Sequence, residues 1–583
     1  MRPVTEKPHA PTAPEAPASQ LARTAARLGG YALASRLLGL LRDMCMAWLV
    51  GSGPTADALA AALRLPHALR RLLGEGSLSM SLTAALVRHC RPDTAAGRSY
   101  LAQAVLLGAA LALLLLLAVA AAPWLATGLA PGFAGPEREL AVFLLRLCLP
   151  YGLAACMAAL GTALLHSLGL FRLPGLSPVL FNVVALAFAG AAALGLCPPA
   201  PALALGMSCA GLAQWALLWW GARRALRRPG PTGASLGGAA AALSETVVAA
   251  AARSAPAPAP VSAAGAAAWR CLAARPAGLL GACAPQFCLL AAAALASGLG
   301  AGLVAGLYYA ERLLEVPLGL VGACLGTASL PALSRLAAQG RQADFAAALR
   351  TALRLTLLLS LPAVAGLWAV GAPLVRALFC HGAFDAQAAQ TAWLMLAGFL
   401  PALPALACNR SLLAACNALG QERRTALSAL AAVASTLAVG AALVHSRGAG
   451  LLPLAFVPPL AAGVGLWLQT GFLLRALAVA LGRAGAANAG AVAVSACLPG
   501  WAAVLRHGLA ALVTGLAARG LVLLTEGWPP GSGLAVAVSG GAVAWVMGLL
   551  LLRDGDMLAL AAHLRGRGVL DSVRETRGTA PRR

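Results

Sequence analysis

Long stretches without a charged side chain constrain this chain more than any other feature. The windows Leu101 to Leu125 and Gly531 to Leu552 contain no Asp, Glu, Lys or Arg, and similar windows recur along most of the 583 residues. A helix of about 20 apolar residues crosses a hydrocarbon core of about 30 Å. With 60% hydrophobic and only 11% charged residues, the sequence predicts an all-α polytopic membrane protein and does not resemble a soluble enzyme.

Apolar windows of about 20 residues predict about fourteen membrane-spanning helices. Their predicted centres lie near residues 40, 72, 113, 155, 183, 211, 287, 318, 362, 402, 435, 463, 515 and 542. The helix near residue 515 is the least regular, because Arg506 and Arg519 interrupt its apolar run.

A Pro/Ala/Gly-rich segment, residues 229–268, divides the chain into two lobes. The predicted parts are a disordered tail (1–26), a first lobe of six helices (27–228), the low-complexity loop (229–268), a second lobe of six helices (269–482), two C-terminal helices (483–553) and a basic tail (554–583). A weak internal repeat relates the two lobes. In the first lobe, Arg64-Leu-Pro-His opens a run that ends in Gly-Glu-Gly-Ser-Leu. In the second lobe, Glu315-Val-Pro-Leu opens a run that ends in Gly-Thr-Ala-Ser-Leu. Two pseudo-related lobes around a central cavity are a common transporter plan.

The arginines predict the orientation in the membrane. Loops near residues 90, 172, 222–275, 335–350, 423 and 475–483 all carry Arg, whereas the alternate loops at 51–55, 197–201, 298–302, 380–385 and 526–532 contain no Lys or Arg. By the positive-inside rule both termini are cytoplasmic, with Arg138 and Arg447 as minor exceptions. The net charge of +24 is therefore attributed to topology, and no nucleic-acid partner is expected.

The sequence contains no recognisable catalytic or metal-binding pattern. Its 14 cysteines form no CxxC pair and its 8 histidines are dispersed. It lacks HExxH, a P-loop and a nucleophile elbow in a plausible strand context. We therefore expect neither an enzyme, nor a metal site, nor a cofactor.

Charged residues inside apolar helices are the candidate functional residues, because a charge at the bilayer centre costs about 2.5–3.5 kcal/mol on insertion scales. The charged residues of the helices near residues 40, 72 and 318 are Arg36, Arg42, Asp43, Arg64, Arg70, Arg71, Glu75, Glu311, Arg312 and Glu315. Helical geometry puts Arg36 and Asp43 on one face and Arg42 on another, and makes Arg71 and Glu75 an i,i+4 pair. Unbalanced guanidiniums facing a cavity would suit a polyanion with phosphate groups.

A structural interpretation remains open beside this functional one. The arginines could form structural ion pairs or extend to the membrane interface, above all Arg64, Arg71 and Glu75 near an expected cytoplasmic end. His67 could contact a ligand, but a packing histidine is at least as plausible.

Spaced motifs in both lobes resemble the MurJ/MviN lipid II flippase family. Ser35-Arg36-Leu-Leu-Gly-Leu-Leu-Arg42-Asp43, Gly51-Ser-Gly-Pro-Thr-Ala-Asp57-Ala and Arg64-Leu-Pro-His-Ala-Leu-Arg70-Arg71-Leu-Leu-Gly-Glu75-Gly are similar to its N-terminal signature. Tyr308-Tyr-Ala-Glu311-Arg312-Leu and Leu378-Phe-Cys-His-Gly-Ala-Phe384 resemble later elements of the family. The resemblance covers about residues 25 to 480. Departures include His67 where Asn is usual and alanine and leucine after Asp57, which affect substrate-contact detail more than membership.

The resemblance implies the fold and the site residues. It implies the multidrug/oligosaccharidyl-lipid/polysaccharide exporter superfamily fold, with two extra C-terminal helices that form a groove for a lipid tail. The substrate-binding residues it implies are Arg36, Arg42, Arg70 and Arg312. Asp57 matches an acidic position near the periplasmic side, and the other supporting residues are Ser35, Asp43, Arg71, Glu75, Glu311 and Glu315.

The function implied is lipid II flipping in the bacterial inner membrane, by alternating access and without covalent change. The diphosphate and peptide carboxylates of lipid II would bind the arginines, and the polyprenyl chain would stay among membrane lipids. The cell-wall synthesis machinery is a further expected partner. Coupling to the membrane potential or to an ion is compatible with the sequence, which identifies no site for it.

Two alternatives stay open at this point. Another exporter of the superfamily, for polysaccharide lipids or drugs, would share the fold, although a drug exporter is expected to show acidic residues rather than an arginine excess. A membrane glycosyltransferase is expected to carry a catalytic carboxylate in a large periplasmic loop, and the predicted outer loops are short.

Overall fold

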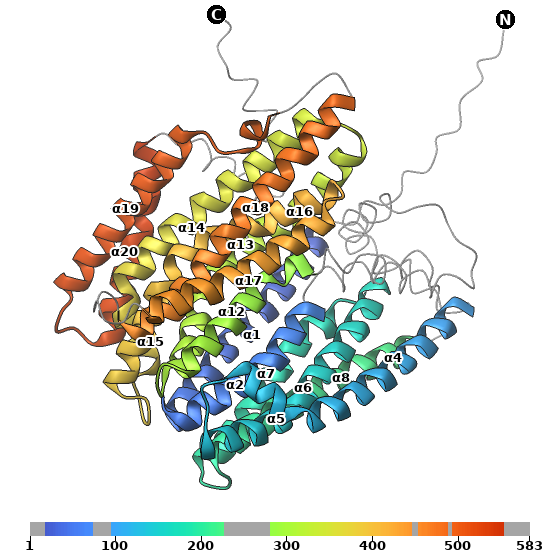
Figure 1. Ribbon diagram of the computed structural model, residues 1–583, viewed down its shortest axis with the longest axis vertical. Coiled ribbons are helices and arrows are strands. Elements are labelled where there is room, and N and C mark those ends of the chain that lie inside the picture. The colour runs from blue at the N-terminus through green and yellow to red at the C-terminus, as the bar shows by residue number, and fades with distance from the viewer. Residues whose placement is uncertain are drawn as a thin grey trace, which may run out of the picture.

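The fold is a bundle of long helices arranged in two lobes with two further helices beside the second (Figure 1). The computed structural model describes residues 18–73, 95–168, 170–226, 280–445, 453–487 and 493–552, and these ranges contain no strand. The predicted all-α class is therefore confirmed for the described part of the chain.

The first lobe contains the helices coloured blue to teal in Figure 1. They are α1 (Ala18–Val50), α2 (Pro54–Leu73), α4 (Ala95–Ala120), α5 (Ala122–Leu129), α6 (Gly135–Ser167), α7 (Arg172–Ala193) and α8 (Pro199–Leu226). Helix α6 packs against α2 and α8, while α7 packs against α1 and α8. This packing brings α1 and α2 to the side of the lobe that meets the second lobe.

The second lobe follows in green to orange. Its helices are α12 (Ala284–Ser297), α13 (Leu303–Ala338), α14 (Gln342–Phe379), α15 (Ala386–Phe399), α16 (Leu403–Ala418), α17 (Glu422–His445) and α18 (Val457–Ala487). The last two helices, α19 (Trp501–Leu524) and α20 (Pro530–Leu551), pack on α14. Helix α13 contacts α2 across the boundary between the lobes.

Two spans are broken at particular residues. Helix α15 ends in a 3-10 turn, Leu400–Ala402, before α16 begins, because Pro401 and Pro404 lack the N–H that would continue the α-helical hydrogen bonds. Helices α4 and α5 meet at a bend of 73°, where Pro123 occupies the first turn of α5.

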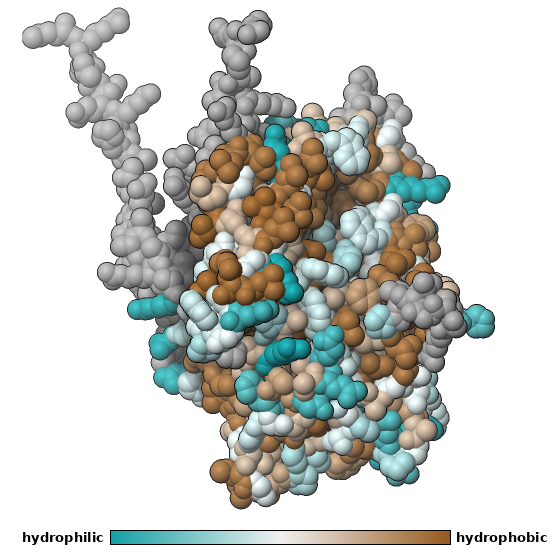
Figure 2. All heavy atoms as spheres, turned by 90° about the vertical axis from the view of Figure 1, so that its left-hand side faces the viewer, coloured by the Kyte–Doolittle hydropathy of each residue, from teal (hydrophilic) through white to brown (hydrophobic). Residues whose placement is uncertain are grey.

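The outer surface is apolar, as expected for helices in lipid. The most exposed large side chains of α19 and α20 include Trp501 at 88%, Leu516 at 65% and Leu551 at 78% exposure. Figure 2 shows brown, apolar side chains over much of the face at the left of Figure 1, with polar patches among them. A surface of this kind stays stable only in a membrane.

The count of fourteen spans remains a prediction. Among the described residues, nine segments are long and apolar enough to cross a membrane, or ten if bent α4–α5 is one span. Helices α1, α2, α12 and α13 also occupy predicted positions but are not among them. Helix α12 has only 14 residues, α1 and α2 carry several charged residues that lower their hydropathy, and the middle of α13 lies outside the residues whose side chains are described. The helix near residue 515 forms as α19 in spite of its two arginines.

Two predicted boundaries differ from the structure. Residues 18–26, placed in a disordered tail, belong to α1, because this Ala-rich stretch contains no proline to stop the helix. Helix α2 begins at Pro54, where proline suits a first helical turn, and the residues directly after Leu73 lie outside the described range. Helix α18 continues to Ala487, past the predicted lobe end at 482. The loop 229–268 and the tail 554–583 lie outside the described residues.

Candidate functional site

Helices α1, α2 and α13 bring six arginines together where the lobes meet. This arginine cluster consists of Arg36, Arg42, Arg64, Arg70, Arg71 and Arg312. The acidic side chains beside them are Asp43, Glu311 and Glu315. Among the residues that the structure describes, the six guanidiniums of the cluster have these three carboxylates beside them, so arginines outnumber acids there.

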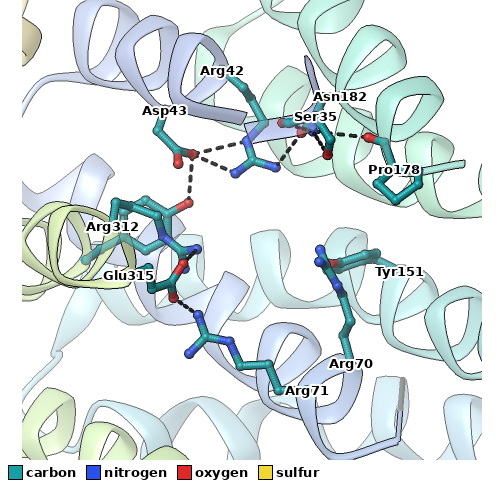
Figure 3. Close-up of polar contacts among 11 residues, drawn as sticks. Ser35, Arg42, Asp43, Arg70, Arg71, Tyr151, Pro178, Asn182, Arg312 and Glu315 are labelled. Atoms are coloured by element: carbon teal, nitrogen blue, oxygen red, sulfur yellow. Dashed lines mark hydrogen bonds and ion pairs between the residues drawn. The ribbon is translucent and has the colours of Figure 1, made fainter. Parts of the chain in front are cut away.

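Arg42 is held by two partners of the first lobe, one of which also contacts the second lobe (Figure 3). Its Nη2 lies 2.8 Å from Asp43 Oδ1, and its Nη1 donates to Asn182 Oδ1 at 3.2 Å. The hydroxyl of Tyr308 on α13 donates to the same oxygen of Asp43 at 3.2 Å. Although Arg42 and Asp43 leave the helix on different faces, the long arginine side chain folds back onto its neighbour.

Arg312 and Arg71 share one carboxylate (Figure 3). Arg312 Nη1 donates to Glu315 Oε2 at 3.0 Å, and Arg71 of the other lobe forms an ion pair with Glu315 Oε1. Arg71 also donates to Gln286 at 3.3 Å. The Arg312 guanidinium lies 4.7 Å from the centre of the Tyr308 ring, a cation–π contact that fixes its orientation. Glu75, the predicted partner of Arg71, lies outside the described residues.

Arg64 and Glu311 form the most buried pair of the group. Arg64 Nη1 lies 2.6 Å from Glu311 Oε1, and the two side chains are 5% and 8% exposed. Each comes from a different lobe, so the pair fixes α2 against α13. Burial of this degree, inside the contact between the lobes, supports the structural interpretation of Arg64 rather than a position at a membrane interface.

Arg70 and Arg36 are held by neutral groups. Arg70 donates to the hydroxyl of Tyr151 at 3.1 Å and faces the ring of Phe181 at 5.9 Å. Arg36 crosses to the second lobe, where a Cβ added to Gly319 would lie 3.0 Å from its Nη2. Gly319 therefore leaves the space that the Arg36 guanidinium needs. At these contacts both guanidiniums lie beside neutral groups.

Supporting neutral residues complete the first lobe's half of the site. Asn182 of α7 donates to the Ser35 carbonyl at 2.9 Å and to its hydroxyl at 3.3 Å. The ring centre of His67 lies 5.6 Å from that of Tyr151 and 6.4 Å from that of Tyr308. Asn182, Tyr151 and Phe181 were not singled out from the sequence, because neutral residues in apolar helices give no signal of their own.

The central space is closed in this structure. A cavity of about 20 Å³, which has room for about one water molecule, is lined by Arg64, His67, Arg71, Tyr308, Glu311 and Arg312 among others. The predicted cavity between the lobes is thus present only as a remnant. Any substrate larger than a water molecule requires the lobes to separate.

Asp57 joins the lobes away from the arginine cluster. Its carboxylate accepts from the backbone N–H of Gly302 at 2.5 Å and of Ala305 at 2.7 Å, both at the start of α13. Negative charge is favourable at a helix N-terminus, where N–H groups lack partners. Asp57 of one lobe therefore caps a helix of the other, and we call this contact of Asp57, Gly302 and Ala305 the inter-lobe latch.

Loops with little side-chain bulk surround the latch. Ser52 donates to the Gly302 carbonyl at 3.2 Å, and the Ala383 N–H donates to the Trp48 carbonyl at 2.9 Å. Gly51 has a positive φ of 69° and no room for a Cβ against Ala383. Three of the loops without Lys or Arg, 51–55, 298–302 and 380–385, thus lie at one end of the molecule.

Comparison with known proteins agrees with the sequence motifs and the fold. The family model of lipid II flippase MurJ matches residues 46–535. The lipid II flippase MurJ of Burkholderia cenocepacia is 30% identical over 384 residues, 63% of this chain and 67% of that protein. A probable lipid II flippase MurJ of Vibrio cholerae is 32% identical over 365 residues, 60% of this chain and 64% of that protein. The matched part is therefore about two thirds of these relatives.

Solved structures show the same fold at low sequence identity. A lipid II flippase MurJ in an inward closed conformation has a TM-score of 0.64 at 16% identity, and covers 90% of this chain and 99% of its own. An inward-facing multidrug MATE transporter of the MOP superfamily has a TM-score of 0.54 at 13% identity over 76% of this chain and 93% of its own. With its apolar helices and its family match over most of its length, the chain is a multi-pass membrane protein that belongs to the lipid II flippase MurJ family.

Proposed function

We propose that this chain flips lipid II, the polyprenyl-diphosphate-linked peptidoglycan precursor, from the cytoplasmic to the periplasmic leaflet of the bacterial inner membrane. The observation that carries the proposal is the arginine cluster, which lies where the two lobes meet and, within the described part of the chain, contains six guanidiniums and three carboxylates. Planar guanidiniums bind phosphate and carboxylate oxygens bidentately. Lipid II offers both kinds of oxygen.

The substrate would enter when the lobes separate beside the cluster. Its diphosphate and peptide carboxylates would bind Arg36, Arg42, Arg70 and Arg312, while the polyprenyl chain stays in the bilayer beside α19 and α20. Opening of the inter-lobe latch would then release the head group on the opposite side. No bond is made or broken, so the protein acts as a carrier rather than an enzyme.

The sidedness of this cycle follows from the arginine distribution. We place both termini in the cytoplasm and the latch at the periplasmic end, because the loops around Asp57 and Gly302 contain no Lys or Arg. The enzymes that polymerise the flipped precursor are the natural partners on that side. The membrane potential could contribute, since it is worth about 2.3 kcal/mol per charge per 100 mV.

The arginine cluster also distinguishes the alternatives. The MATE-like fold is shared with drug exporters, so the fold alone does not choose between them. Hydrophobic cations would be repelled by an excess of guanidiniums, whereas a diphosphate would be attracted. A polysaccharide-lipid substrate with the same diphosphate remains the second candidate, because the same contacts would bind it.

The test is complementation of cells depleted of their own lipid II flippase, combined with a direct assay of lipid II in the outer leaflet. The full chain should restore growth and outward lipid II. The matched control is Arg341→Ala, which removes an exposed arginine paired with Asp344 outside the cluster and should behave as wild type. A chain that reaches the membrane at normal abundance and restores neither growth nor lipid II translocation would refute the proposal.

A further inference from the structure

Glu315 occupies the position that an anionic substrate would need. Its two carboxylate oxygens are divided between two guanidiniums, Oε2 with Arg312 of the same helix and Oε1 with Arg71 of the opposite lobe (Figure 3). Both arginines line the remnant cavity. Arg312 cannot offer both of its Nη atoms to a phosphate while one of them is engaged by Glu315.

This arrangement differs from the other ion pairs of the cluster. Arg42 is paired with its chain neighbour Asp43. The Arg64–Glu311 pair is buried, with side chains that are 5% and 8% exposed. The Glu315 side chain is 36% exposed, although its Oε1 toward Arg71 is buried, so of these three acidic side chains it is the most accessible to solvent. It also lies on α13 one turn from Arg312, where a rotation of its side chain frees both guanidiniums without moving the backbone.

We infer that Glu315 is a built-in competitor for the substrate diphosphate, which holds Arg71 and Arg312 together in the empty carrier and is displaced when the diphosphate binds. The inference rests on the proposed function and identifies a residue that sets its specificity. Glu315 carries a single negative charge, so a diphosphate can replace it while a weaker anion, such as a phospholipid phosphodiester, competes poorly. The contact of Glu315 with Arg71 and Arg312 would then both close the empty carrier and exclude ordinary phospholipids.

The test measures binding of farnesyl diphosphate to the purified full-length protein at low ionic strength. Glu315→Gln keeps the size of the side chain and removes the competing charge. We expect it to bind farnesyl diphosphate about three- to tenfold more tightly than wild type, and to discriminate less against farnesyl monophosphate. Glu315→Asp, which keeps the charge but is too short to reach both guanidiniums, should fall between the two.

Asp344→Asn is the matched control. Asp344 pairs with Arg341 three residues away at 2.7 Å and is 38% exposed, so it resembles Glu315 in spacing and exposure but lies outside the cluster. Its replacement should leave the affinity unchanged, which separates competition at the site from a general change of charge.

Two results would overturn the inference. Equal or weaker binding by a folded Glu315→Gln protein would mean that Glu315 supports the arginines instead of competing with the ligand. If Glu315→Gln does not fold, equal or weaker binding by Glu315→Asp decides the same point. The proposed function is tested separately, by restored growth and by lipid II in the outer leaflet. Farnesyl diphosphate can bind more tightly to Glu315→Gln whether or not the chain flips lipid II, so the two proposals can fail independently.

Discussion

The two lobes contact each other at two places with opposite chemistry. At the inter-lobe latch, one carboxylate binds the backbone N–H groups of Gly302 and Ala305, and the surrounding loops are tightly packed. In the arginine cluster, long side chains share partners, as Arg71 and Arg312 share Glu315. The latch can open only when whole helices move, whereas the cluster can be rearranged by the rotation of side chains.

The same two helices carry both contacts. Asp57 and Arg71 lie on α2, and Gly302 and Arg312 lie at or beyond the start of α13. At a rise of 1.5 Å per residue, the stretch of α2 between Asp57 and Arg71 spans about 20 Å. A ligand that changes the spacing of α2 and α13 in the cluster therefore changes the geometry at the latch, which is what alternating access requires.

The largest effect is expected from Arg312→Ala, which removes the guanidinium that α13 contributes to the substrate site. Translocation should fall at least about 30-fold, the factor for a lost charged contact of about 2 kcal/mol. Arg312→Lys should be nearly as defective, because an ammonium cannot form the bidentate phosphate contact or replace the flat contact with Tyr308. Complementation and outward lipid II would be measured at matched abundance. Normal growth with Arg312→Ala would leave the substrate site to the first lobe alone.

A second prediction concerns the stability of the buried pair. Arg64→Leu alone leaves Glu311 as an uncompensated buried charge and should destabilise the protein by about 3–5 kcal/mol. The double variant Arg64→Leu with Glu311→Leu should recover most of this stability, because well-packed apolar residues often replace a buried ion pair without loss. Thermal unfolding of the purified proteins measures both. If the double variant is stable but inactive, the pair has a role in transport and the structural interpretation of Arg64 is wrong.

A smaller effect is expected at the latch. Asp57→Asn keeps the shape of the side chain but replaces one acceptor oxygen by a donor, so only one of the two backbone N–H groups can remain bound. Hydrogen exchange at Gly302 and Ala305 should rise about tenfold, which corresponds to about 1.4 kcal/mol. Asp385→Asn is the control, since Asp385 caps α15 within one lobe by accepting from Ala388 at 2.7 Å. Unchanged protection in Asp57→Asn would mean that packing of the loops, not the carboxylate, holds this end closed.

The sequence was sufficient to predict the all-α class and the approximate positions of the described helices. Apolar length indicates most of them, and charges such as Arg312 are conspicuous in an apolar window. Contacts of these charges across the two lobes could not be predicted, because they depend on how close the lobes approach. The contact of Arg71 with Glu315 of the other lobe is one example.

Residues without charge were also missed. Asn182 orients Arg42, and Tyr151 binds Arg70, but a single Asn or Tyr in an apolar helix resembles any other. The same holds for Gly319, whose missing side chain gives Arg36 its place. Such roles depend on contacts between helices far apart in sequence. They become visible only when the packing of the helices is known.

The smallest effect is expected from the low-complexity loop, residues 229–268, which lies outside the described residues. A Pro/Ala/Gly-rich segment has too little apolar patterning to bury a core of its own, so its expected role is to join α8 to α12. Replacing residues 232–262 with a shorter flexible linker should leave complementation and outward lipid II unchanged, provided that the linker still spans the two helix ends. Loss of transport at normal membrane abundance would show that the two contacts are not sufficient for the cycle, and would assign the loop a partner or a regulatory role.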